Sequence, residues 1–226
     1  MSILMDSPLT FGAIDGEFIQ PLSDYYWRGE RNNRKGTKKS KKNYLISYAS
    51  KKDFSAIVSL YNNIRRNSYF EPIHYIEAAI KDGRFEDMWN KALDDDNNRE
   101  RVVKIEVGGQ LVAFMRCGQI APPVSVPNSK TGGKKWGALR QIYVHDAFRQ
   151  NGWGKLLFKK AEHELMRMGC THMFITAIGS NDKGRIFYER HGAKLETPIM
   201  GLERCDGKNF FLQRLHFSKR LAAIPQ

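Results

Sequence analysis

The residues best suited to chemistry lie in one short stretch, where an apolar segment ending at Val144 runs into a turn that contains glycine. Gly152 and Gly154 allow the backbone to approach a ligand closely, and a helix that begins at Gly152 leaves its first amides without intrahelical partners. Such amides, at the positive end of the helix dipole, form a cradle for phosphate groups. Arg149 and Lys155 add positive charge beside it. The pattern therefore predicts a site for a ligand that carries a pyrophosphate.

Two other glycine-rich phosphate motifs do not fit this stretch. The dinucleotide-binding fingerprint requires a third glycine where Leu157 stands. The P-loop requires Ser or Thr after its lysine, and here that position is Leu156. What remains, Arg149-x-x-Gly152-x-Gly154, resembles the signature with which GCN5-related N-acetyltransferases (the GNAT family) bind the pyrophosphate of coenzyme A.

A second segment, 181–193, extends this resemblance. It is similar to the family's Asn-x-x-Ala-x-x-Phe/Leu-Tyr-Glu-x-x-Gly-Phe segment, with Gly184 at the usual Ala and Ala193 at the usual Phe. The resemblance covers about residues 44–217 and is most specific from 139 to 193.

The resemblance implies that the ligand is acetyl-CoA and gives each residue a role. Backbone groups of Ile142 and Val144 would pair with the pantetheine arm, and Asn181 would face the far end of that arm. Tyr188 would protonate the departing thiolate, with Ser180 as a candidate proton relay. The alternative for Tyr188 is a core tyrosine packed on a short helix. The residues expected to hold or support the pyrophosphate are Arg149, Gln150, Asn151, Gly152, Trp153, Gly154 and Lys155.

The positions at which many relatives carry a general base hold other residue types in this chain. Where Glu or Asp often stands ahead of the signature, this chain has Arg140 and Gln141, and neither accepts a proton usefully at neutral pH. Glu106 and His145 are alternatives, and otherwise water takes the proton of the amine. An Arg140 side chain directed at the acceptor would suit an anionic acceptor. The competing interpretation is an arginine that is paired at the surface.

The formal net charge of +13 favours anionic partners. Residues 28–43 hold eight Lys or Arg against one Glu. Such density predicts a flexible basic extension over 1–43, ahead of a single GNAT domain over 44–226. DNA or RNA is a candidate partner for 28–43, and a solvated linker is the alternative.

The remaining composition excludes other classes. Cys117, Cys170 and Cys205 are scattered without metal-ligand or disulfide spacing, and His163 has no second ligand one turn away, so no metal is expected. No run approaches the roughly 20 apolar residues of a membrane span, and no secretory signal is recognisable. These features favour a cytoplasmic protein without membrane contact. They do not indicate an oligomeric state.

Hydrophobic periodicity predicts a mixed α/β fold. The resemblance makes it a GNAT fold, with a mostly antiparallel sheet, a splayed parallel pair at its centre and flanking helices. The segment 172–178 is nearly all apolar, which is typical of a strand buried on both faces. Strands are expected over 44–49, 101–107, 110–117, 136–144, 172–178 and 210–217. Helices are expected after Ser50, after Pro72, and over 85–92, 152–169 and 183–191, and the loop 121–133 is expected to shape the acceptor site.

The sequence thus predicts an enzyme that moves an acetyl or other short acyl group from coenzyme A to an amine by direct attack in a ternary complex. The acceptor is expected to be macromolecular: a nucleic acid, or a protein associated with one. A small amine is an alternative. A third hypothesis is a nucleic-acid-binding protein that keeps the coenzyme A site without turnover, which the missing carboxylate favours and the intact site residues oppose.

Overall fold

The computed structural model describes residues 44–67, 83–94, 99–123, 133–196, 199–205 and 208–222. The expected helix after Pro72, most of the loop 121–133 and the basic extension 1–43 lie outside these residues.

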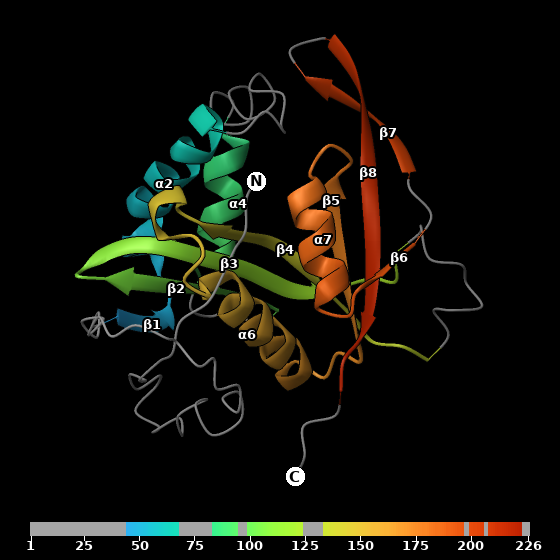
Figure 1. Cartoon of the computed structure of the whole chain (residues 1–226), viewed down its shortest axis with the longest axis horizontal. Coiled ribbons are helices and arrows are strands. Elements are labelled where there is room, and N and C mark those ends of the chain that lie inside the picture. Colours follow the sequence, from blue (N-terminus) through green and yellow to red (C-terminus); the bar gives the residue numbers. More distant parts are fainter. Residues whose placement is uncertain are drawn as a thin grey trace, which may run out of the picture.

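The described strands form one mixed sheet of eight strands in the order β1-β2-β3-β4-β5-β8-β6, with β7 paired to β8 (Figure 1). Every pairing is antiparallel except that of β4 with β5, which is parallel. The expected sheet, mostly antiparallel with a central parallel pair, is confirmed. The strand bounds are β1 Tyr44–Tyr48, β2 Glu100–Val107, β3 Gln110–Ile120, β4 Trp136–Val144, β5 His172–Ile178, β6 Lys194–Leu195, β7 Ile199–Cys205 and β8 Lys208–Arg220.

The helices lie on both sides of this sheet (Figure 1). The expected start at Ser50 is confirmed, since the Asp53 carboxylate accepts a hydrogen bond from the Ser50 backbone amide at 2.9 Å. No helix within the described ranges is long and apolar enough to cross a bilayer. The bounds are α2 Phe54–Asn67, α4 Arg84–Ala92, α6 Trp153–Arg167 and α7 Asp182–Arg190, with 3-10 turns η1 Lys51–Asp53 and η2 Asp146–Phe148.

A separate hydrophobic core lies on each face of the sheet. One lies under α6 and α7 and includes Leu139, Ile175 and Tyr188. The other lies under α2 and α4 and includes Trp89 and Tyr143. Ile142 and Val144 belong to the first core and Tyr143 between them to the second, so neighbouring positions of β4 contribute to opposite faces, as the alternation of side chains along a strand requires.

The parallel pair separates soon after it begins. Residues of β4 and β5 are in register only from Trp136 with His172 to Leu139 with Ile175. Beyond that point β4 runs on to Val144 without a partner among the described residues on its β5 side, so the two strands splay apart. We call the point where the pairing ends, at Leu139 and Ile175, the vertex. A β-bulge in the β3–β4 pairing lies next to it, since Arg116 is opposite Gln141 while Cys117 is opposite Leu139.

The C-terminal strands differ from expectation. The strand expected over 210–217 is longer, and β7 and β6 were not expected. Figure 1 shows β7 and β8 as a long hairpin that extends past the rest of the sheet. The expectation that β5 is buried on both faces is wrong. Its residues alternate between buried and half-buried, and the half-buried set includes Phe174 and Thr176. The described helices cover that strand from one side only.

Candidate active site

The turn between β4 and α6 has an unusual backbone that glycine and a polar side chain stabilise. Gly152 has a φ of 84° and Gln150 a φ of 61°, both in the left-handed region. The Asn151 amide donates hydrogen bonds to the carbonyls of Phe148 and Arg149, at 3.1 and 3.0 Å. Asn151 thus holds the turn with its side chain, which leaves its backbone as the part that can meet a ligand.

Helix α6 begins with unpaired amides and no compensating acid. The first intrahelical bond runs from the Leu156 amide to the Gly152 carbonyl at 2.9 Å, so the amides of Trp153, Gly154 and Lys155 precede it. The first turn contains no acidic residue, although Asp and Glu are favoured there. The positive end of this helix therefore has no acidic side chain from its own first turn.

Two side chains of this turn do not point at that end. The Trp153 indole is buried and packs edge-on against Tyr44, with ring centroids 4.9 Å apart, so only its backbone can contact a phosphate. The Arg149 guanidinium pairs with Asp146, and its Nε donates to the Val144 carbonyl at 3.3 Å. Arg149 therefore stabilises the turn through Asp146 and Val144, while Lys155 is exposed beside it.

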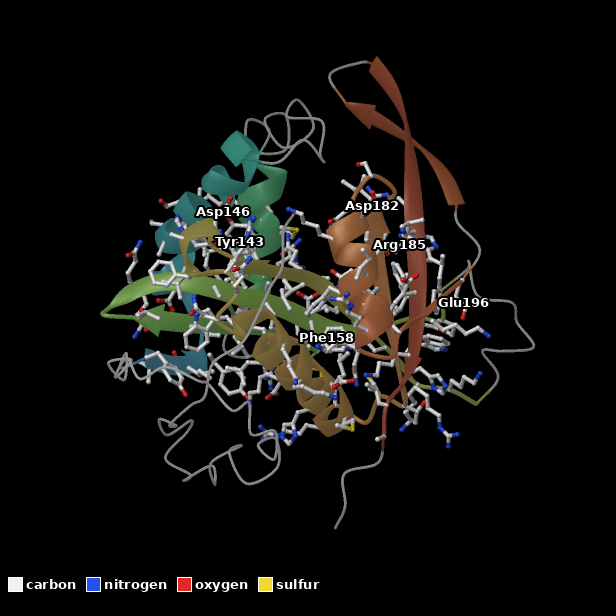
Figure 2. The ribbon with its side chains drawn as sticks, viewed as in Figure 1. Tyr143, Asp146, Phe158, Asp182, Arg185 and Glu196 are labelled. Carbon is white, nitrogen blue, oxygen red and sulfur yellow. The ribbon has the colours of Figure 1, made fainter. Side chains whose placement is uncertain are left out.

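Asp146, which pairs with Arg149, also contacts Tyr143, whose side chain lies on the other face of the sheet. The Tyr143 hydroxyl lies 3.5 Å from Asp146, and these two residues are neighbours in Figure 2. Burial, followed by the charge of Asp146, raises the pKa of Tyr143 to about 12. This contact fixes the end of β4 relative to η2 and so positions the turn.

β4 presents a free backbone edge beside the turn. Ile142 and Val144 pair with Met115 and Ala113 of β3 on one side. On the other side β5 no longer pairs with them. Their side chains are buried in the core under α6. The backbone of this segment can therefore accept an extended ligand in the way it would accept another strand.

Helix α7 begins at a buried asparagine. Asn181 is 1% exposed, and its side-chain oxygen accepts a hydrogen bond from the Gly184 amide at 2.9 Å. A Cβ at Gly184 would lie 2.5 Å from the Asn181 Nδ2, so the glycine that replaces the usual Ala makes room for this cap. Ser180 is exposed in the turn just before it, on the same side of the sheet as α7.

Tyr188 lies fully buried on α7 near the vertex. Its ring packs against Phe217, with centroids 5.4 Å apart, and Phe217 is opposite Ile175 in the β5–β8 pairing. Phe158 of α6, labelled in Figure 2, contacts it from the helix side at 6.3 Å between centroids. The hydroxyl is covered and has no hydrogen-bond partner among the described residues. Burial raises the pKa of this phenol.

Such an orphaned donor is costly in a purely structural tyrosine. The Tyr188 ring lies beside the vertex, since it packs against Phe217 opposite Ile175.

The residues that the sequence offered as a general base are engaged in other contacts. Glu106 is paired with Lys104 at 3.2 Å, and His145 accepts a hydrogen bond from the Ala147 amide at 3.2 Å. Arg140 forms an ion pair with Glu100 of β2 at 2.7 Å, in line with the surface-paired interpretation. Glu100 itself was missed in the sequence, because only the register of β2, β3 and β4 brings it to this point.

Two of the three cysteines, Cys117 and Cys170, have described side chains. Cys117 and Cys170 are free and buried, and burial raises the pKa of both thiols. The part of the chain that the structure describes contains no group of His, Cys, Asp and Glu side chains that could hold a metal ion.

Comparisons with known proteins agree on the family and on the fold. Residues 44–193 match the profile of the acetyltransferase (GNAT) family. No curated protein matches the sequence significantly. Many solved structures share the fold, at low sequence identity.

Three of these structures are described here. A GNAT-family acetyltransferase from Streptococcus pneumoniae is 19% identical with a TM-score of 0.56, over 79% of this chain and 99% of its own. The PaiA N-acetyltransferase from Thermoplasma acidophilum, in complex with coenzyme A, is 18% identical with a TM-score of 0.57, again over 79% and 99%. A ribosomal-protein-alanine N-acetyltransferase from Brucella melitensis is 16% identical with a TM-score of 0.52, over 78% and 99%.

Proposed function

The chain belongs to the acetyltransferase (GNAT) family, and on this premise we propose that it transfers the acetyl group of acetyl-CoA to an amine of a macromolecular acceptor. The observation that carries the proposal is the uncompensated amide end of α6 beside the free edge of β4. A ligand with a pyrophosphate and an extended arm satisfies both features at once. The unpartnered Tyr188 hydroxyl lies near the other end of that path.

In this proposal each residue of the turn acts mainly through its backbone. The amides from Asn151 to Lys155 hold the pyrophosphate, and Lys155 adds a charge-assisted contact. Arg149 keeps the turn in shape through Asp146, with Gln150 supplying the left-handed bend. Ile142 and Val144 bind the pantetheine arm with their backbone groups, and Asn181 fixes the start of α7 against its far end.

The chemical step is a direct displacement. The amine nitrogen forms a bond to the thioester carbonyl carbon, the carbon–sulfur bond breaks, and one proton of the amine leaves to water. Tyr188 stabilises the departing sulfur by a hydrogen bond and supplies its proton. Ser180, exposed ahead of α7, is the candidate group for returning a proton from solvent to Tyr188.

The pH dependence of this step tests the role of Tyr188. Burial raises the pKa of its phenol, so the proton-donating form persists through the usual titration range of tyrosine, near pH 10. We expect kcat to rise with pH as the acceptor amine loses its proton and not to decline between about pH 9 and 10. The measurement is the release of free coenzyme A thiol against pH, corrected for spontaneous hydrolysis. A decline with a midpoint near 10 would contradict the assigned role.

The macromolecular acceptor is supported by charge. The chain carries a formal net charge of +13, and residues 28–43 alone hold eight Lys or Arg against one Glu. Such an excess attracts polyanions and has no use toward a small cationic amine. The fold itself accommodates protein acceptors, as the name of the Brucella melitensis enzyme indicates. We propose that 1–43 is an extension through which a nucleic acid, or a protein bound to one, is recruited to the domain at 44–226.

A salt titration tests this recruitment. We expect a fluorescent RNA or DNA oligonucleotide to bind with an affinity that falls linearly with salt on a logarithmic scale, with a slope of roughly −0.7 to −0.9 per phosphate neutralised. Replacing the eight Lys and Arg of 28–43 by Gln and Ser should weaken binding at low salt and flatten the slope by several units. The matched control replaces the uncharged residues of the same segment and keeps every charge. An unchanged slope in the neutralised variant would exclude this segment as the contact.

A further inference from the structure

The vertex is closed on one face of the sheet and accessible on the other. Under α6 and α7, the side chains of Leu139, Ile175 and Tyr188 are at most 3% exposed, so that face offers no route for an acceptor through the described residues. On the α2 and α4 face, Arg140 is exposed, and its side chain retains 37% of its accessible surface. An acceptor therefore meets the thioester from the side of Arg140.

The location of the thioester follows from the path of the ligand. A pyrophosphate at α6 and an arm along β4 bring the reactive end back toward the vertex. Arg140 lies four positions before Val144 in the strand, which corresponds to about 13 Å. Arg140 and Gln141 are the first two residues of β4 beyond its last pair with β5. The bulge at this point turns Arg140 out of the regular alternation.

Arg140 belongs to an ion-pair cluster with an excess of one positive charge. Glu100 accepts from Arg116 through Nε at 2.9 Å, and its other oxygen lies 2.7 Å from the Arg140 Nε. Arg116 is 7% exposed, and its guanidinium lies 5.7 Å from the centre of the Trp89 ring, so it is fixed in place. Arg140 is held by Nε alone among the contacts of the described residues. Its two terminal nitrogens form the planar edge that suits a carboxylate or phosphate.

Gln141 follows Arg140 in β4 and carries a covered hydrogen-bond acceptor. It is opposite Arg116 in the β3–β4 pairing and is half-buried. Its side-chain oxygen is covered and has no partner among the described residues. This oxygen is therefore able to accept a hydrogen bond from a ligand. An amine supplies the donor for such a bond.

We propose that Arg140 and Gln141 form the acceptor site, which takes an amine that carries an anionic group, carboxylate or phosphate, close to the reacting nitrogen. Arg140 binds the anion, Glu100 positions Arg140, and the Gln141 oxygen receives an N–H of the amine. This inference rests on the acetyl transfer proposed above. It assigns acceptor binding to Arg140 and Gln141, the two positions at which a carboxylate often stands in the family.

The test uses matched pairs of acceptors that differ in one charge. The peptides Gly-Asp-amide and Gly-Asn-amide represent the carboxylate source, and aminoethyl phosphate and ethanolamine represent the phosphate source. Release of coenzyme A is measured with the full chain. We expect the anionic member of at least one pair to be acetylated about 10- to 100-fold more efficiently in kcat/KM. The pair with the larger ratio identifies the source of the anion.

Variants decide whether Arg140 causes the preference. Arg140→Gln should abolish it, Arg140→Lys should keep part of it because the charge remains without the fork, and Arg190→Gln, an exposed arginine on α7, should leave it intact. The proposal is overturned if the wild type shows no preference, if no anionic probe is acetylated, or if the preference survives in Arg140→Gln. Acetyl-CoA binding is measured separately by calorimetry. Its absence in the wild type would instead refute the proposed function.

Discussion

Replacing Tyr188 by Phe is expected to lower kcat for acetyl transfer by about 10²- to 10³-fold while leaving the fold at least as stable. The hydroxyl is covered and has no partner among the described residues, so its removal relieves a desolvation cost of about 1 kcal/mol. The ring contacts with Phe158 and Phe217 remain in the variant. The measurements are steady-state coenzyme A release at saturating substrates and the free energy of unfolding in urea.

Tyr48→Phe is the matched control, because it should show the opposite behaviour. The Tyr48 hydroxyl donates to the buried Glu164 at 3.0 Å, far along the sheet from the vertex. Its loss should cost about 1 kcal/mol of stability and leave kcat unchanged. A Tyr188→Phe enzyme that keeps full activity and loses stability would show that Tyr188 is a structural core residue.

The turn between β4 and α6, at which we propose phosphate binding, could be predicted from the sequence because its determinants are adjacent in the chain. Gly152 and Gly154 mark the start of α6, and Asn181 caps α7, as local sequence patterns indicate. The strands from β1 to β4 also followed from periodicity and from the Gly108-Gly109 turn. In each case the signal lies within a few residues of the structure that it produces.

The contact between Glu100 and Arg140 could not be predicted, because it depends on register. Glu100 reaches Arg140 across β3 only through the β2–β3 and β3–β4 pairings and the bulge beside Cys117, and no local pattern encodes them. The sequence predicted that β5 is buried on both faces because its residues are nearly all apolar. Its half-buried face reflects which elements cover it, a tertiary property that hydrophobicity along one strand does not specify.

The amide end of α6 makes Gly154 the most sensitive position for ligand binding. Gly154 is buried in the first helical turn, between two amides that precede the first intrahelical bond. A Trp side chain there would cover those amides and exclude a phosphate. Gly154→Ala adds one methyl group and raises helix propensity by about 1 kcal/mol, so the helix should form readily in that variant. We expect Gly154→Ala to weaken acetyl-CoA binding and Gly154→Trp to weaken it by at least about 100-fold, equivalent to about 2.7 kcal/mol.

The most direct measurement is calorimetric titration of acetyl-CoA into the wild type, Gly154→Trp and Ala56→Trp, each first shown to be folded by circular dichroism and thermal melting. Ala56 is exposed on α2, so its substitution controls for the addition of a large aromatic side chain. The account predicts roughly micromolar binding by the wild type and Ala56→Trp, and none detectable for folded Gly154→Trp. A folded wild type that does not bind acetyl-CoA, or a Gly154→Trp variant that binds as tightly as the wild type, would contradict it.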